Sequence, residues 1–210
     1  MSFSLASKPF RCARAPGVFR ALLLAAAILP GPPVMLPPRA SAPLIAVSGT
    51  PPGGLQSYPA LASLGSTLFV AWSDGREGAL DRLYWTHFTG DPPDSLAAPL
   101  TTDVASELHA ALASGSGWAL AAWESWTTTG SRLVAARVDG PGGPGSREVT
   151  RITSGPGPVR RPALAVLENV AVIVWEDERV KPGDLYCAIW ERTEGLRDPE
   201  GVPFATGAGF

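Results

Sequence analysis

The stretch that decides the fold reads Phe-Val-Ala-Trp-Ser-Asp-Gly-Arg at residues 69–76. It returns as Val-Ile-Val-Trp-Glu-Asp-Glu-Arg at residues 172–179, and in altered form as Leu-Ala-Ala-Trp-Glu-Ser-Trp at residues 120–126. The shared tryptophans, Trp72, Trp123 and Trp175, are 51 and 52 residues apart. An internal repeat of this length is the strongest structural signal in the chain.

Other landmarks keep nearly the same spacing. Each copy holds one leucine before the tryptophan and one after it: Leu61, Leu112 and Leu164, then Leu83, Leu133 and Leu185. The three copies cover about residues 58–102, 109–153 and 161–206, and each contains short β-type runs separated by turn residues. Four short antiparallel strands in a repeat of about 40–50 residues is the pattern of a propeller blade.

The strand that carries the tryptophan is apolar on both of its alternating faces. In the first copy Leu68 and Val70 point one way and Phe69 the other, and the third copy behaves alike. A sheet with one wet face would alternate apolar and polar residues. The pattern therefore indicates sheets covered on both sides, and we predict an all-β, β-propeller-like array of three four-stranded blades.

Three blades are fewer than the four to eight that usually close a propeller. The expected fold is therefore an incomplete or truncated propeller. A truncated gene product, a fragment, and a half-ring that pairs with another chain all fit, and the sequence favours truncation. Open blade faces would expose apolar surface, so self-association through them is one interaction that the sequence allows.

The first 42 residues have the composition of an export signal. Basic residues precede an unbroken apolar run at residues 21–29, prolines follow it, and Ala40-Ser41-Ala42 matches a signal-peptidase site. The apolar run is shorter than the about 20 residues of a membrane span. We therefore predict a signal peptide over residues 1–42 and a repeat segment over residues 43–210. The repeat segment would be secreted, periplasmic or at the cell surface, without membrane association after cleavage.

Charge and cysteine content narrow the functional classes. Residues 1–42 hold five of the 17 basic residues and none of the 19 acidic ones, so residues 43–210 carry a net charge of −7. Such a surface does not suit nucleic acid or anionic lipid. Cys12 lies in the signal segment, and Cys187 remains alone in an apolar strand, where we expect a buried small hydrophobe.

The Trp-x-Asp-x-Arg element, followed by Asp-(x)-Leu-Tyr, resembles the repeats of secreted bacterial propeller proteins of the sialidase-like (BNR-type) superfamily. The matching residues are Trp72, Asp74 and Arg76 with Asp81, Leu83 and Tyr84, and Trp175, Asp177 and Arg179 with Asp184, Leu185 and Tyr186. The second copy departs from the pattern and lacks both the Asp and the Arg. The resemblance implies a propeller. A fold does not fix an activity, and the arginine triad, tyrosine nucleophile and acidic partner of true sialidases cannot be assigned to residues of this chain.

The candidate binding residues are Asp74, Arg76, Asp177, Arg179 and Trp126. A carboxylate beside a guanidinium at a loop could hold a sugar or a peptide. The structural alternative is that the Asp accepts turn N–H groups and the Arg pairs with it. Recurrence of the pair favours the structural role. Trp126, like Trp190, lies outside the repeating position, and stacking on a sugar or packing in the core would both explain it.

Among the remaining residues the sequence offers no catalytic constellation, metal site or cofactor motif. Calcium prefers closely spaced oxygen ligands, and no Asp-x-Asp-x-Asp run occurs. His87 and His109 lie in different copies without a Cys or acid at ligand spacing, and we expect both at solvent-facing strand positions. The sequence thus predicts a non-enzymatic extracellular module that binds a protein or glycan or acts as a scaffold. The alternative is a sialidase-like glycoside hydrolase or an inactive remnant of one.

Overall fold

The computed structural model describes residues 54–90, 97–101, 105–138, 149–155 and 157–206. All of them belong to one compact unit. The predicted signal peptide therefore lies outside the described residues. The described residues form strands, turns and bends, so none of their segments is a helix long and apolar enough to cross a membrane.

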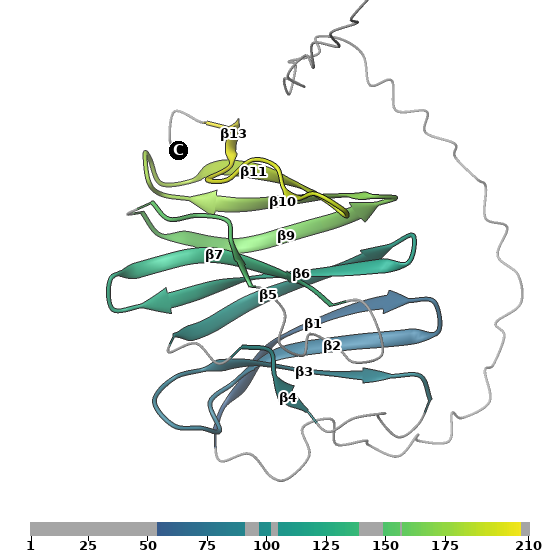
Figure 1. The fold of residues 1–210 in the computed structure, drawn as a ribbon. Helices are drawn as coiled ribbons and strands as arrows, with labels where there is room; N and C mark the ends of the chain where they lie inside the picture. The colour runs from purple at the N-terminus through teal and green to yellow at the C-terminus, as the bar shows by residue number, and fades with distance from the viewer. Residues whose placement is uncertain (1–53, 91–96, 102–104, 139–148, 156, 207–210) are drawn as a thin grey trace, which may run out of the picture. The chain divides into compact units, whose positions relative to one another are not determined.

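Each sequence repeat forms one antiparallel sheet, here called blade 1, 2 or 3 (Figure 1). Blade 1 contains β1 (Gln56–Leu64), β2 (Thr67–Asp74), β3 (Arg82–Phe88) and β4 (Ala98–Pro99). Blade 2 contains β5 (Ser106–Gly115), β6 (Trp118–Thr127), β7 (Gly130–Arg137) and β8 (Thr150–Arg151). Blade 3 contains β9 (Val159–Leu167), β10 (Val170–Asp177), β11 (Asp184–Glu191), β12 (Gly195–Leu196) and β13 (Val202–Ala205). The all-β array of three up-and-down blades is confirmed.

Two short strands share the outer edge of β11 in blade 3. Strand β13 pairs Pro203 with Tyr186, as β4 pairs Pro99 with Tyr84 in blade 1. Strand β13 is therefore the fourth strand of the repeat. Strand β12 pairs with the far end of β11 and forms an additional hairpin.

The inner strand of every blade bends at the same place. The pairing register shifts there, and the shift contains a non-glycine residue with positive φ: Tyr58 (54°), His109 (50°) or Arg161 (50°). A β-bulge of this kind bends its strand and increases the local twist. Bulky side chains rarely adopt positive φ, so its return in all three blades shows that the repeat extends to backbone conformation.

The blades pack face to face around two buried clusters. One cluster joins blades 1 and 2 and includes Phe69, Leu100 and Trp123, and the other joins blades 2 and 3 and includes Ile152 and Trp175. Strand β6 contributes alternate residues to both clusters, and residues 118–125 are all buried. Burial on both faces is thus confirmed for blade 2. Blades 1 and 3 each have one face that no described sheet covers.

Candidate functional site

Asp74 accepts hydrogen bonds at both of its carboxylate oxygens. Trp72 Nε1 donates at 2.9 Å and Gln56 Nε2 at 2.8 Å to Oδ2, and the backbone N–H of Arg76 donates at 3.0 Å to Oδ1. The Arg76 guanidinium completes the group with an ion pair of 2.5 Å and lies 4.2 Å from the ring centre of Tyr84. Asp74 is fully buried. The predicted pair Asp74–Arg76 therefore fastens the end of β2 to the rest of blade 1.

Asp177 and Arg179 repeat this arrangement in blade 3. Trp175 Nε1 lies 2.9 Å from Asp177 Oδ2, and the Arg179 side chain donates to both carboxylate oxygens. Arg179 also donates to the backbone oxygen of Glu200 at 2.7 Å and pairs with its carboxylate at 3.3 Å. The arginine of blade 3 thus also holds the segment that leads into β13.

These contacts keep both aspartates ionised. Burial alone would raise the pKa of Asp74, but hydrogen bonds from Arg76, Trp72 and Gln56 outweigh it and hold the pKa well below its usual range. The pKa of Asp177 is lowered in the same way, with Arg179 and Trp175 outweighing burial. A carboxylate that stays ionised and already accepts several N–H groups is poorly suited to donate a proton in catalysis.

In blade 2 a carboxylate at a different position accepts the hydrogen bond from the repeated tryptophan. Ser125 stands where blade 1 has Asp74, and its cross-strand partner is Glu107, where blade 1 has Gln56. Glu107 accepts from Trp123 Nε1 at 3.0 Å, and also from the Leu83 backbone N–H at 3.1 Å in blade 1. In blade 2 the acidic residue therefore lies on the inner strand β5, whereas in blade 1 it lies on the tryptophan strand β2. The sequence comparison missed Glu107, because only the strand register shows that positions 107 and 125 face each other.

Trp126, near the end of β6, contacts Glu124, and Glu124 in turn lies against the bulge residues of two inner strands. Its Nε1 donates to Glu124 Oε2 at 2.8 Å, and Glu124 Oε1 accepts from the Arg161 backbone N–H at 2.7 Å. His109 Nδ1 lies 2.9 Å from Glu124 Oε1 but without the angles of a hydrogen bond, and the centre of the His109 ring lies 4.0 Å from that of the Tyr58 ring. Trp126 is half-buried and tied to Glu124.

The other histidine corrects our expectation. His87 is buried and stacks on Trp85 with ring centres 5.6 Å apart. Its place in β3 puts it on the face toward blade 2, next to Phe69. Cys187 is buried as expected. Within the described part of the chain, His, Cys, Asp and Glu form no group of three that could hold a metal ion.

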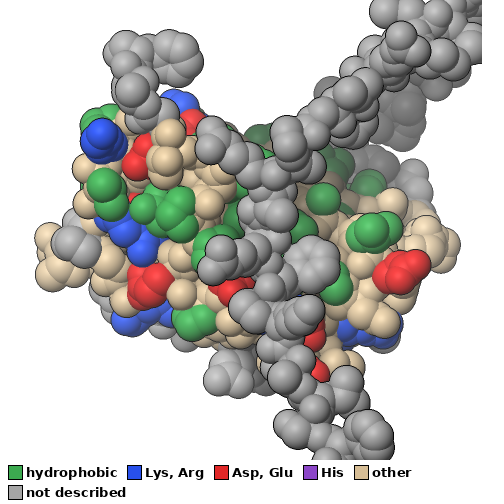
Figure 2. Space-filling view, turned by 90° about the horizontal axis from the view of Figure 1, so that it is seen from above, with side chains coloured by type: hydrophobic (Ala, Val, Ile, Leu, Met, Phe, Trp, Pro, Cys, Tyr) green, Lys and Arg blue, Asp and Glu red, His purple; other side chains and the backbone are tan. Residues whose placement is uncertain are grey.

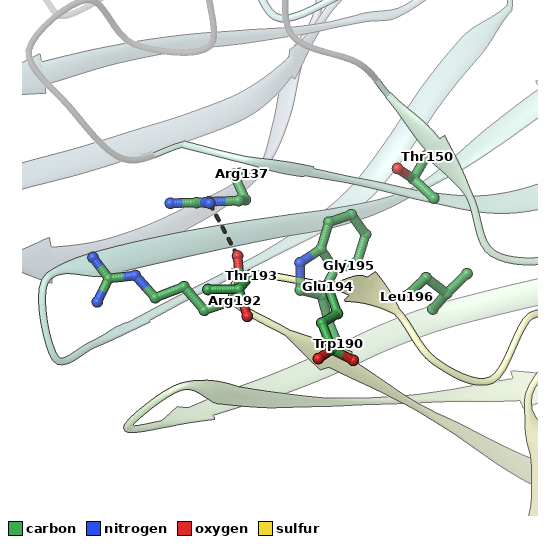
Figure 3. Close-up of a pocket in the computed structure, with 8 residues that line it drawn as sticks. All are labelled: Arg137, Thr150, Trp190, Arg192, Thr193, Glu194, Gly195 and Leu196. Carbon is green, nitrogen blue, oxygen red and sulfur yellow. Dashed lines mark hydrogen bonds between the residues drawn. The ribbon is translucent and has the colours of Figure 1, made fainter.

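A pocket of about 590 Å³ lies between blade 2 and the β11–β12 hairpin of blade 3 (Figure 3). Blade 2 contributes Arg137 and Thr150, and blade 3 contributes Trp190, Arg192, Thr193, Glu194, Gly195 and Leu196. Unlike the Trp-Asp-Arg group, this set of residues does not recur among the described residues of the other blades. The pocket is therefore the better candidate for a ligand site.

Contacts between the blades fix the hairpin that forms the pocket wall. Gly195, the first residue of β12, directly follows the tight turn at residues 192–194 and has φ +82°, which suits glycine. The Arg192 guanidinium donates to the backbone oxygens of Ser116 at 3.0 Å and Gly117 at 3.2 Å in blade 2. In return, Arg137 donates to the backbone oxygen of Arg192 at 3.1 Å, which Figure 3 shows as a dashed line. These hydrogen bonds from Arg192 and Arg137 therefore fix the hairpin against blade 2.

Among the residues that the structure describes, the indole N–H of Trp190 finds no acceptor, although Trp190 is only 6% exposed. The indole N–H groups of Trp72, Trp118, Trp123, Trp126 and Trp175 each donate a hydrogen bond within the protein. A buried donor without a partner costs about 1–3 kcal/mol. The N–H is itself covered by neighbouring residues, so a ligand atom that accepts this bond would remove the cost only if those residues moved aside. No sequence signal separates Trp190 from the other tryptophans outside the repeat.

No protein-family model matches the chain, and no curated protein matches it. The solved structures that match it include the following three. The subtype N10 neuraminidase-like protein of A/little yellow-shouldered bat/Guatemala is 12% identical, with a TM-score of 0.49 over 74% of this chain and 46% of that one. The native arabinanase Arb43A of Bacillus subtilis is 12% identical, with a TM-score of 0.43 over 70% of this chain and 56% of that one. The GH43 endo-arabinanase of Bacillus licheniformis is 10% identical, with a TM-score of 0.29 over 73% and 78%.

This chain thus spans less than half of the length of the neuraminidase-like protein. All three TM-scores are below 0.5, and the fold assignment rests on the strand pairing and blade packing described above.

Proposed function

We propose that the chain is a non-enzymatic, extracellular β-propeller repeat module that binds a glycan in the pocket beside Trp190. The observation that carries the proposal is the pocket between blade 2 and the β11–β12 hairpin, whose wall includes Trp190 with its covered indole N–H that lacks an acceptor. Export rests on the predicted signal peptide over residues 1–42.

The size and chemistry of the pocket fit a sugar unit. Small-molecule sites typically enclose about 300–1,000 Å³ and combine apolar surface with a few placed polar groups. Trp190 and Leu196 supply apolar surface, and Thr150 and Thr193 supply hydroxyl groups. Sugar hydroxyl oxygens could accept from the Trp190 N–H, while sugar hydroxyl groups could donate to Glu194. A ligand with alternating donors and acceptors suits this lining better than a purely apolar one.

The distribution of carboxylates supports binding over hydrolysis. Glycoside hydrolysis commonly uses two carboxyl groups that flank the scissile bond. Glu194 is the single carboxylate among the eight residues that line the pocket. Asp74 and Asp177, the acids of the repeated motif, are already occupied by Trp and Arg side chains.

A panel of neutral and acidic mono- and disaccharides tests the proposal by saturation-transfer NMR and calorimetry. We expect Trp190→Phe, which keeps the ring and removes the N–H, to weaken binding of the retained sugar about tenfold. Trp126→Phe is the matched control, because Trp126 donates to Glu124 outside the pocket. Failure of the whole panel to bind, or equal binding by Trp190→Phe, would contradict the proposal. Turnover of sialosides or other glycosides would favour the hydrolase alternative instead.

A further inference from the structure

Three turns meet beside the pocket, and together they are here called the turn junction. The β5–β6 turn of blade 2 contains Ser116 and Gly117, the β9–β10 turn of blade 3 contains Glu168 and Asn169, and the β11–β12 turn begins at Arg192. The backbone N–H of Arg192 donates to the backbone oxygen of Asn169 at 2.8 Å. The Arg192 guanidinium donates to the backbone oxygens of Ser116 and Gly117. Arg192 therefore contacts both of the other turns.

The β11–β12 hairpin depends on these contacts because its own strand pairing is short. Strand β12 pairs with β11 at two positions, Gly195 opposite Glu191 and Leu196 opposite Trp190. A two-stranded hairpin is at best marginally stable in water unless it packs on other elements. Gly195 and Leu196 both line the pocket. The position of this pocket wall therefore depends on the bonds that fasten the hairpin to blade 2.

The Arg192 side chain is directed at blade 2 rather than at the other pocket residues of the hairpin. In Figure 3 it points away from Trp190 and Leu196. A guanidinium holds its five N–H donors in a rigid planar fork, so two bonds to adjacent carbonyl groups fix its direction. Arg192 can thus affect a ligand through the hairpin that it holds.

We infer that Arg192 is the positioning residue of the pocket: it holds the β11–β12 hairpin to the β5–β6 turn and thereby sets the affinity for a ligand that its guanidinium does not contact. This role rests on the glycan site proposed above. Ser116 and Gly117 are not among the residues that line the pocket. A change in the β5–β6 turn of blade 2 therefore alters binding at a wall that blade 3 supplies.

Hydrogen exchange of the full chain without ligand tests the anchoring itself. Arg192→Met removes the guanidinium donors and keeps an unbranched side chain. The backbone N–H at position 197 donates to the backbone oxygen of Ile189 across the hairpin at 2.8 Å, so its protection reports the opening of the hairpin. We expect this protection to fall at least about fivefold in Arg192→Met. Unchanged protection would overturn the inference.

Calorimetry with the sugar that binds in the saccharide panel measures the effect on affinity. We expect Arg192→Met to weaken binding about tenfold. Arg192→Lys should weaken it only about threefold, because lysine keeps the charge and donor groups but lacks the planar fork. Circular dichroism verifies that both variants fold.

Arg197→Met is the matched control from the same hairpin. Arg197 pairs with Glu191 within blade 3 at 2.9 Å, and the two side chains are 52% and 26% exposed. Figure 2, which looks from the blade 3 side of Figure 1, shows basic and acidic side chains near one another on the surface. Exposed ion pairs contribute little stability. Arg197→Met should therefore leave the protection and the sugar affinity nearly unchanged.

A double-mutant cycle separates positioning from direct contact with the ligand. Gly117 has φ +83°, so Gly117→Ala strains the turn whose backbone oxygen accepts from Arg192. We expect Gly117→Ala to weaken sugar binding about threefold in the unaltered chain and to have no further effect in Arg192→Met, because both changes act through one contact.

Two outcomes of the binding experiments would make Arg192 a ligand contact and overturn the inference. One is that the losses from Gly117→Ala and Arg192→Met simply add. The other is that Arg192→Met weakens binding while the protection at position 197 stays the same. If no sugar binds the unaltered chain, the proposed glycan site is wrong, and the exchange measurement alone decides whether Arg192 positions the hairpin.

Discussion

Blades 1 and 2 make the same hydrogen bond to their repeated tryptophan with different residues. Each must provide an acceptor for the indole N–H of its repeated tryptophan. Blade 1 places the carboxylate on the tryptophan strand, at Asp74, opposite Gln56 on the inner strand. Blade 2 places it on the inner strand, at Glu107, opposite Ser125 on the tryptophan strand.

The difference shows that the constant element of the repeat is the tryptophan and its acceptor, rather than the Asp-Arg sequence. A buried indole N–H needs a hydrogen-bond partner. Two facing positions on adjacent strands can supply it, since their side chains lie on the same side of the sheet. The second copy therefore keeps the interaction even though its sequence no longer shows the motif.

Removal of the blade 2 acid should have the largest effect. Glu107 is buried and accepts from Trp123, from the Leu83 backbone and from Thr101. Glu107→Ala would leave these donors without their acceptor, and we expect a loss of about 3–5 kcal/mol in the free energy of unfolding. Urea denaturation followed by tryptophan fluorescence measures it.

A double variant that moves the carboxylate from position 107 to position 125 is the control for this prediction. Glu107→Gln combined with Ser125→Asp recreates the blade 1 pair in blade 2. The double variant should be more stable than Glu107→Gln alone, because the new Asp can accept from Trp123. If the two changes only add their separate losses, the equivalence of the two arrangements is wrong.

A smaller loss of stability is expected from a substitution at Gly201, which packs against Trp175 in blade 3. A Cβ on Gly201 would lie 2.2 Å from Trp175 Cη2, and the residue has φ +69°. Gly201→Ala should therefore cost about 2–4 kcal/mol through strain and overpacking. Gly65 also has positive φ, but a Cβ there would meet no atom within 4 Å. Gly65→Ala should cost only about 1 kcal/mol, and equal losses in thermal unfolding would argue against close packing at Trp175.

The smallest effect concerns acid sensitivity. Because the folded state lowers the pKa of Asp74 and Asp177, the unfolded chain takes up protons first as the pH falls below about 4. Their contribution is present above that pH and is lost progressively below it. The variant with Asp74→Asn and Asp177→Asn should be less stable at neutral pH. Its stability should also change less between pH 5 and pH 3, by about 1 kcal/mol over this interval for each removed carboxylate. An unchanged slope in urea titrations at the two pH values would contradict this.

Repetition made the fold predictable from the sequence. The spacing of Trp72, Trp123 and Trp175 predicted three equivalent strands, and the structure pairs each of them at the centre of its own sheet. The fourth strands are only two to four residues long, and their bounds could not be predicted. Short edge pairings depend on backbone geometry that residue patterns scarcely reflect.

The pocket could not be predicted, because it depends on contacts between blades. Arg192 reaches backbone oxygens of residues more than 70 positions earlier in the chain. Backbone oxygens carry no residue signature, so the sequence does not indicate this anchor. The unmet N–H of Trp190 is likewise visible only once every neighbouring acceptor has been placed. His87 was assigned to solvent for the same reason, because the face toward blade 2 was not known.

The shared bend of the inner strands also has a use in protein engineering. Tyr58, His109 and Arg161 adopt nearly the same φ, although their side chains differ in size and charge. The path of the strand is therefore compatible with an aromatic, an imidazole or a guanidinium group at this position. Combinatorial libraries that vary these three positions together would display a row of chosen side chains on adjacent blades while the strand pairing stays the same.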